Sequence, residues 1–345
     1  MNTDYSLPLP QSSRFQFSPD LQICRILNGM WQVSGAHGYI DPEIAVESMF
    51  PYLDSGFTTW DLADHYGPAE DLIGEFRRRL VARRGPDTMA GVQAFTKWVP
   101  GPGQMDRSQV EENINTSLRR MDVDSLDLLQ FHWWDYGDER YLDAMGHLEN
   151  LRIEGKIKHL GLTNFDTQHL QKIVDSGYKV VSNQVQYSLV DRRPEIQMVQ
   201  YCQEQGIHLL AYGTLGGGLL SDRYLGQPEP GRAALTTASL SKYKRMVDAW
   251  GGWDLLQDLL LTLKGIADRH GVSIADVAMR YVMDRPATAG VIVGVRLGVA
   301  DHRDDNAQVF GLGLDAEDRV RIESVLSRSR DLYQIIGDCG DEYRR

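Results

Sequence analysis

The chain has 345 residues, of which 42% are hydrophobic and 24% are charged, and it carries a formal net charge of −12. These values are typical of an ordinary globular protein and argue against intrinsic disorder. Because no basic stripe offsets the acidic charge, we expect neither nucleic acid nor an anionic membrane as a partner.

The three cysteines, Cys24, Cys202 and Cys339, are too few and too scattered to indicate a disulfide framework or a zinc site. The N-terminal segment has no apolar stretch preceded by positive charge, so it does not resemble a secretory signal. No apolar run approaches the length of a membrane span. We therefore expect a cytoplasmic protein.

Short apolar runs alternate with amphipathic segments along the chain. Most of these runs are rich in Leu, Val, Ile or Phe and do not alternate with polar residues, which is typical of strands buried on both faces of a parallel sheet. The predicted strands, in chain order, are Ile23–Leu27, Thr58–Leu62, Val92–Lys97, Leu126–Phe131, His159–Thr163, Val180–Asn183, His208–Tyr212 and Gly290–Val293.

Helices are predicted between these strands. Residues 106–121 carry an apolar stripe at helical spacing, and Ser108 and Glu111 have the spacing of a capping box at its start. A second amphipathic helix is predicted over 273–283, and a further helix over 315–327 follows the last strand.

Eight strand–helix units in one chain predict a closed (β/α)8 barrel, with residues 1–345 as a single domain and an extra C-terminal helix. The alternative is a doubly wound open sheet, which usually carries G-x-G-x-x-G after its first strand. Here that position reads Asn28-Gly29-Met30-Trp31, without the glycine pattern. The barrel is therefore favoured.

The interval between the seventh and eighth strands is unusually long, and its excess runs over about residues 215–253. It contains the glycine cluster Gly216–Gly218, which we interpret as a flexible loop, and two prolines. Long loops inside compact domains are often lids or binding loops. We predict a mobile flap over the barrel mouth; a passive insertion is the alternative.

Polar side chains stand where three consecutive strands end. Asp61 ends the second strand and Tyr66 follows it, Lys97 ends the third strand, and His132 directly follows the fourth. Taken singly, each has an ordinary structural explanation as a cap, a packed ring or a solvated charge. Strand ends of such a barrel meet at one rim, so the four are predicted to form one catalytic site.

The chemistry of these four groups is complementary. Tyrosine has an unperturbed pKa of about 10 and is a better general acid when that value falls. A neighbouring Lys97 ammonium would lower the pKa of Tyr66, and Asp61 could pair with the buried lysine. His132 could then orient a carbonyl oxygen between itself and Tyr66.

Further polar residues are predicted on the same rim. The fifth strand ends in Thr163 and Asn164, the sixth leads into Gln184, and the seventh ends in Tyr212. Amide side chains can hold a carboxamide, and an aromatic face can stack on a flat heterocycle. The set suits a nicotinamide; the alternative is that Asn164 and Gln184 only cap loops.

On these residues the sequence resembles the aldo-keto reductase family. The resemblance extends from about Leu27 to Val325 and implies a nicotinamide-dependent oxidoreductase on a (β/α)8 barrel. The segments that carry it are Gly56–Gly67 with Glu70, Thr96-Lys97, Asp127–Trp133, Gly155–Ile157, Gly161–Phe165 (where Ser-Asn is commoner than Thr163-Asn164), Asn183-Gln184 and Ala211–Leu215.

The resemblance implies a role for each site residue. Tyr66 would protonate the carbonyl oxygen as hydride arrives, Lys97 and Asp61 would tune Tyr66, and His132 would position the substrate. The substrate mouth would be lined by Met30, Trp31, Trp98 and Trp133, although ordinary packing is the alternative for each. The residues expected at the cofactor are Gly29, Met30, Asp61, Thr163, Asn164, Gln184, Tyr212, Gly213, Thr214, Leu215, Gly294, Arg296, His302 and Asn306.

The sequence departs from the family after the eighth strand. Val293-Gly294-Val295-Arg296 replaces the usual Pro-Gly-Ala-Arg, and His302 stands four residues before Asn306. A guanidinium suits the 2′-phosphate, so we expect NADPH to be preferred, with NADH possible. The alternative is that Arg296 pairs with a nearby acid, among Asp301, Asp304 and Asp305.

The expected activity is reduction of aldehydes or ketones, or the reverse reaction on sugars or alcohols. A second hypothesis is a redox-responsive subunit that binds the cofactor with little turnover. A third is a metal-dependent hydrolase that uses Asp61, His65 and His132, although the lysine strand supplies no ligand to it. We therefore expect no metal, and a small-molecule carbonyl or sugar as the substrate.

Overall fold

The computed structural model describes residues 9–101, 103 and 105–344. Eight parallel strands close into a barrel in the order β10-β3-β4-β5-β6-β7-β8-β9, which confirms the (β/α)8 prediction. The barrel strands are β3 Ile26–Gly29, β4 Thr59–Asp61, β5 Gln93–Trp98, β6 Leu126–Phe131, β7 Ile157–Thr163, β8 Ser182–Gln186, β9 His208–Tyr212 and β10 Thr288–Gly294.

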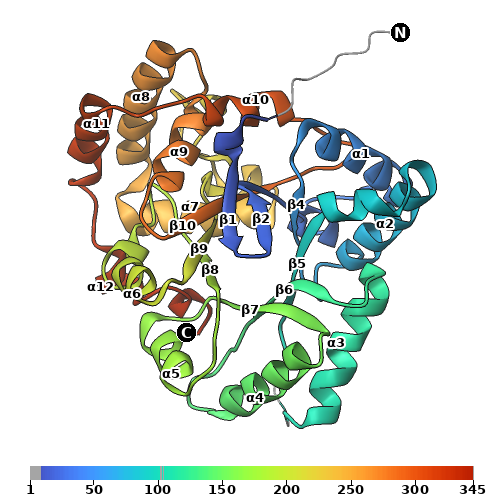
Figure 1. The fold of residues 1–345 in the computed structure, drawn as a ribbon. Coiled ribbons are helices and arrows are strands. Elements are labelled where there is room, and N and C mark those ends of the chain that lie inside the picture. Colours follow the sequence, from blue (N-terminus) through green and yellow to red (C-terminus); the bar gives the residue numbers. More distant parts are fainter. Residues whose placement is uncertain (1–8, 102, 104, 345) are drawn as a thin grey trace.

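Helices surround the barrel, as Figure 1 shows. Because the strands face the core on one side and these helices on the other, nearly all their side chains are buried. The helices are α1 Pro42–Ser55, α2 Ala69–Arg84, α3 Arg107–Met121, α4 Arg140–Ile153, α5 Thr167–Asp175, α6 Met198–Gln205, α7 Ala238–Trp250, α8 Gly252–His270, α9 Ile274–Met283, α10 Arg303–Ala307, α11 Ala316–Leu326 and α12 Leu332–Ile336.

A hairpin that the sequence analysis did not predict precedes the barrel. It pairs β1 (Arg14–Ser18) with β2 (Leu21–Cys24) in antiparallel fashion. The predicted strand Ile23–Leu27 is therefore wrong as one element, because it joins the end of β2 to the start of β3. Phe17 packs against Phe95 inside the barrel at 5.7 Å between ring centroids, so the hairpin closes the end of the barrel at which the strands begin.

Two predicted helices keep their positions, but the cap predicted for the first of them differs. The N-cap of α3 is Asp106, whose carboxylate accepts from the backbone N–H of Gln109, so the expected capping box at Ser108 is wrong. Helix α11 begins after Asp315, which forms a reciprocal capping box with Asp318. A carboxylate at either N-cap also meets the positive end of the helix dipole.

The connection between β9 and β10 is more regular than predicted. The stretch expected to be a loop includes helix α7 and short 3-10 turns, one of them at Gly216–Gly218. Gly217 has φ of 65° and an added Cβ would lie 3.0 Å from the ring of Tyr243 on α7. The glycine cluster therefore forms a compact turn under α7, and the expectation of a flexible loop is corrected.

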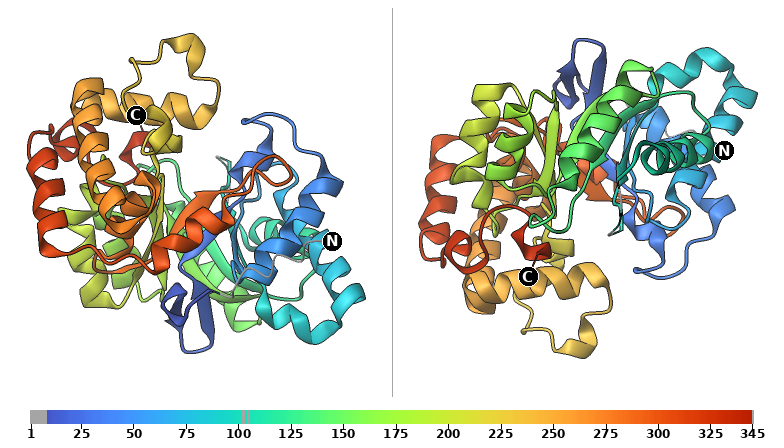
Figure 2. Two further views of the ribbon diagram at one scale, coloured as in Figure 1. Left: turned by 90° about the horizontal axis from the view of Figure 1, so that it is seen from above. Right: turned by 90° about the horizontal axis from the view of Figure 1, so that it is seen from below.

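The last described residues lie at the rim of the barrel opposite the hairpin. Figure 2 shows the hairpin at one end and α7 with the C-terminus at the other. After α12 a 3-10 turn, Asp341–Tyr343, brings the last described residues back to the ends of the strands. These residues lie beyond the region of family resemblance, and the sequence analysis assigned them no role.

Candidate active site

The four predicted catalytic residues lie together at the C-terminal ends of the strands. The Lys97 ammonium donates to Asp61 Oδ2 at 2.6 Å and to the carbonyl of Leu62 at 2.8 Å. It also lies 5.0 Å from the centroid of the Tyr66 ring. The backbone N–H of His132 donates to the carbonyl of Trp98, one residue after Lys97, at 3.0 Å. Neighbouring parallel strands thus bring residues distant in sequence to one rim.

Asp61 is the centre of a buried hydrogen-bond network. Besides Lys97, its carboxylate accepts at Oδ1 from Gln130 Nε2 at 3.0 Å and from Gln184 Nε2 at 2.7 Å. The sequence analysis missed Gln130, although a glutamine inside an otherwise apolar strand is a signal for a buried polar network. Because Asp61 is bonded from both oxygens, its orientation and that of Lys97 are fixed.

Tyr66 does not have the lowered pKa that the sequence analysis expected. Burial is the main cause that raises the pKa of its phenol well above 10, and the charge of Asp61 raises it further. Lys97 does not offset this, because its ammonium is paired with Asp61 and burial lowers the pKa of Lys97 itself. Tyr66 therefore carries its proton throughout the physiological pH range.

His132 is held as a neutral ring. Its Nδ1 lies 3.1 Å from the carbonyl of Thr163, so Nδ1 carries the hydrogen and Nε2 carries the lone pair. Burial lowers the pKa of His132 to about 4. Nε2 is buried without a hydrogen-bond partner among the described residues. In this state His132 can accept from a hydroxyl group but cannot donate to a carbonyl oxygen, which changes the role expected for it.

The residues expected at the nicotinamide lie at the ends of β7, β8 and β9. Thr163 pairs with Gln184 in the strand register. The amide nitrogen of Gln184 donates to Asp61 and to Gln130 Oε1, each at 2.7 Å. The amide oxygen of Gln184 is then left to accept from a carboxamide. Asn164 adopts φ of 58° and its Oδ1 accepts from the Tyr212 hydroxyl at 2.8 Å. This donor and acceptor set fits a nicotinamide carboxamide.

Two glycines at the rim leave room for neighbouring side chains. Gly29 pairs with Gly294, and a Cβ on Gly294 would lie 2.0 Å from the Gln32 side chain. Gly213 has φ of 71°, and a Cβ there would lie 2.6 Å from the Tyr243 hydroxyl. Of the other residues expected in these turns, Met30 and Thr214 are buried and Leu215 is half-buried.

Two tryptophans do not line the mouth as expected. Trp98 is 2% exposed and stacks on Phe131, with 5.3 Å between the ring centroids. Successive residues of a strand point to opposite faces, so Trp98 points away from the barrel interior whereas its neighbour Lys97 points inward. Trp133 is also buried, and its ring nitrogen donates to loop carbonyls. The next residue, Trp134, is 45% exposed and its ring lies 4.3 Å from that of His132. Trp31 remains half-buried beside the rim.

The residues expected near an adenosine phosphate follow β10. Arg296 is exposed and forms no ion pair within the described part of the chain. Arg303, which the sequence analysis did not single out, pairs with Asp301 at 2.7 Å, so Asp301 does not neutralise Arg296. His302 is exposed and Asn306 is buried.

The metal-hydrolase alternative would use Asp61, His65 and His132 as ligands. Across residues 9–101, 103 and 105–344, no group of three or more His, Cys, Asp or Glu side chains is arranged to bind a metal ion. The side chain of His65 contacts Asp64, its neighbour in sequence. Within the same residues, no helix has the length and apolar character needed to cross a membrane.

The site thus combines a protonated phenol, a buried lysine–aspartate pair and a neutral histidine at the C-terminal rim of a (β/α)8 barrel. A family model described as the aldo/keto reductase family matches residues 25–327. The chain belongs to the aldo/keto reductase family of oxidoreductases.

Three similar proteins each share less than 30% sequence identity with this chain. Pyridoxal reductase from Arabidopsis thaliana is 27% identical, over 80% of this chain and 75% of that protein. Aldo-keto reductase YhdN from Bacillus subtilis is 24% identical, over 90% of this chain and 92% of that protein. Flagellar radial spoke protein 5 from Chlamydomonas reinhardtii is 29% identical over 64% of this chain, which spans only 49% of that protein.

Solved structures share the fold. The glycerol dehydrogenase from Gluconobacter oxydans superposes with a TM-score of 0.76 at 21% identity, covering 92% of this chain and 96% of that one. An aldo/keto reductase from Klebsiella pneumoniae, solved in complex with NADP and acetate, gives a TM-score of 0.67 at 21% identity, covering 91% of this chain and 95% of that one.

Proposed function

We propose that this chain reduces aldehydes or ketones to alcohols with NADPH, and that Tyr66 is the general acid. The observation that carries the proposal is the position of the Tyr66 ring, 5.0 Å from an ammonium that is itself held by Asp61 at 2.6 Å. The reverse reaction, on sugars or alcohols, would use the same groups. NADPH, when bound, supplies the hydride.

The residues of the site would supply the proton, position the substrate and hold the cofactor. Tyr66 holds its proton until oxygen charge develops on the substrate, and then donates it. Lys97 and Asp61 form an ion pair whose two charges largely cancel, and this pair keeps the Tyr66 phenol in place. His132 Nε2 accepts a hydrogen bond from the hydroxyl group that forms, so it positions the alcohol. Asn164, Gln184 and Tyr212 would hold the nicotinamide, as the contacts at the ends of their strands support.

The two directions of the reaction should differ in their pH dependence. Because burial keeps Tyr66 protonated, the rate of reduction should stay nearly flat from about pH 5 to about pH 9, with a change only near the pKa of His132, about 4. Alcohol oxidation needs the phenolate, so its rate should rise by about tenfold per pH unit over the same range. Measured profiles of kcat/KM in both directions test this. A fall in reduction centred near neutrality would show instead that cofactor binding lowers the pKa of Tyr66.

The cofactor preference should depend on Arg296. Its exposed guanidinium has no acidic partner among the described residues, so it can grip the 2′-phosphate that distinguishes NADPH from NADH. Hydrogen bonds to charged groups contribute about 1.5–3 kcal/mol, so Arg296→Ala should weaken NADPH binding by about 10- to 150-fold and leave NADH binding nearly unchanged.

Titration of both cofactors against the wild type and Arg296→Ala is the measurement. Arg321→Ala, which removes an exposed arginine on α11, is the matched control and should leave both affinities unchanged. Equal losses for NADPH and NADH, or a wild type that prefers NADH, would refute the role of Arg296.

The activity itself is tested by supplying aldehydes, ketones and sugars with NADPH or NADH and following cofactor absorbance. Turnover of a carbonyl compound supports the proposal. Cofactor binding without turnover of any compound would favour the second hypothesis, a redox-responsive subunit.

A further inference from the structure

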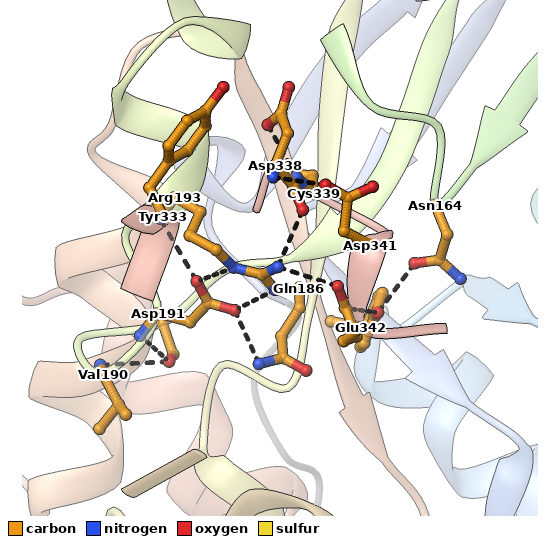
Figure 3. A network of polar contacts seen from close by, with 12 residues as sticks. Asn164, Gln186, Val190, Asp191, Arg193, Tyr333, Asp338, Cys339, Asp341 and Glu342 are labelled. Carbon is orange, nitrogen blue, oxygen red and sulfur yellow. Dashed lines mark hydrogen bonds and ion pairs between the residues drawn. The ribbon is translucent and has the colours of Figure 1, made fainter. Parts of the chain in front are cut away.

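The C-terminal segment, residues 338–344, is anchored by a buried ion-pair network. Arg193 pairs with Asp191 through two bonds of 2.8 Å, and both side chains are almost fully buried. The remaining nitrogen of Arg193 donates to the carbonyl of Asp338 at 2.9 Å and to Glu342 at 3.0 Å. Figure 3 shows Arg193 between Asp191 and the C-terminal residues, with Asn164 nearby. The segment is therefore fixed to the barrel by charge.

The charge on Glu342 is maintained in spite of its burial. Burial alone would raise the pKa of this carboxyl group, but Arg193 and Lys242 outweigh it and lower the pKa. Glu342 also lies 3.2 Å from the Tyr212 hydroxyl. The ion-pair network that anchors the C-terminal segment thus contacts Tyr212, the side chain that is proposed to stack on the nicotinamide.

The backbone of the segment approaches Asn164 so closely that only glycine fits. Gly340 has φ of 87°, and an added Cβ would lie 2.1 Å from the carbonyl oxygen of Asn164. A side chain at this position would meet rigid backbone and would also require a left-handed conformation. The C-terminal segment and the proposed carboxamide site are therefore packed against each other.

A chain of hydrogen bonds runs from α7 to Asn164 through the segment. The Lys242 ammonium donates to the hydroxyl oxygen of Tyr343, the Tyr343 and Tyr212 hydroxyls lie 3.2 Å apart, and Tyr212 lies 2.8 Å from Asn164 Oδ1. The Tyr212 hydroxyl has one hydrogen, and Asn164 Oδ1 at 2.8 Å is nearer to it than Glu342 or Tyr343, both at 3.2 Å, so Tyr212 donates to Asn164. Tyr343, whose oxygen accepts from Lys242, can then donate its own hydrogen to Tyr212. The amide at the end must then present its oxygen to Tyr212 and direct its NH₂ group elsewhere.

We propose that Tyr343 is a positioning residue for the nicotinamide. By joining Lys242 to Tyr212, it fixes the orientation of the Asn164 amide, whose NH₂ then donates to the carboxamide oxygen. It also holds the Tyr212 ring, one face of which is covered by Lys242 at 4.8 Å, so that the opposite face receives the nicotinamide. This inference rests on the proposed function. It makes the C-terminal segment part of the cofactor site.

Tyr343→Phe tests the inference, because it keeps the ring against Trp134 and removes only the hydroxyl. NADPH and 2′,5′-ADP, which lacks the nicotinamide, are titrated against each protein. Loss of one net hydrogen bond should weaken NADPH binding by about 3- to 10-fold, and 2′,5′-ADP binding should stay unchanged. Tyr333→Phe is the matched control: its hydroxyl accepts an exposed hydrogen bond from Gln197, and the variant should match the wild type with both ligands.

Gly340→Val is a second, stronger variant, because its side chain would push the segment off Asn164. It should also weaken NADPH selectively. Unchanged NADPH binding in both variants would overturn the inference, as would equal losses for NADPH and 2′,5′-ADP. Tighter NADPH binding or faster turnover would overturn it too, by showing that the segment covers the site. A wild type that binds 2′,5′-ADP and NADPH equally, with no turnover, would overturn the proposed function itself.

Discussion

Tyr66→Phe is expected to remove most turnover while leaving cofactor binding nearly intact. Phenylalanine keeps the ring that lies beside Lys97 and deletes only the hydroxyl that donates the proton. General acid catalysis typically contributes about 10²–10⁴-fold, so kcat for carbonyl reduction should fall by that factor. Steady-state kinetics and NADPH titration on the same protein measure the two effects.

Tyr178→Phe is the matched control for this substitution. Its hydroxyl contacts the carbonyl of Leu142 at 3.3 Å, in the helical layer, so its loss should leave kcat unchanged. If Tyr66→Phe kept wild-type turnover under conditions where the chemical step limits the rate, Tyr66 would not be the acid.

Lys97→Met should lower both stability and activity. The Lys97 side chain is 4% exposed and so is that of Asp61, so the substitution leaves a carboxylate buried without its cation. Removing one partner of a buried pair typically costs about 3–5 kcal/mol of unfolding free energy. Chemical denaturation should show this loss, and Lys158→Met, which removes an exposed lysine paired with Asp127, should show little.

The double variant Asp61→Asn with Lys97→Met separates the two consequences. It removes both charges and keeps an amide that can still bond to Gln130 and Gln184, so much of the lost stability should return. Activity should not return, because the phenol has lost the groups that hold it. A double variant as unstable as Lys97→Met alone would contradict this account of the pair.

The sequence by itself determined the barrel and the composition of the rim. Buried parallel strands are continuous apolar runs, so their number and positions can be found without knowing their partners. Asp61, Lys97 and His132 each end such a run, and topology alone then places them on one rim. The strand Ile23–Leu27 was misassigned because the apolar pattern continues across the bend at Arg25, where the hairpin meets the barrel.

Only the tertiary structure decided the protonation states and the final composition of the site. The pKa of Tyr66 depends on burial and on whether Lys97 is already paired, and neither can be read from residue types. Whether a tryptophan lies at the mouth also depends on its tertiary surroundings: Trp98, the last residue of β5, is buried against Phe131, whereas Trp134 lies in the loop after β6 and is exposed beside His132. Tyr343 contacts Tyr212, although the two residues are separated by 131 positions in the sequence. A local sequence pattern cannot predict a contact between residues so far apart.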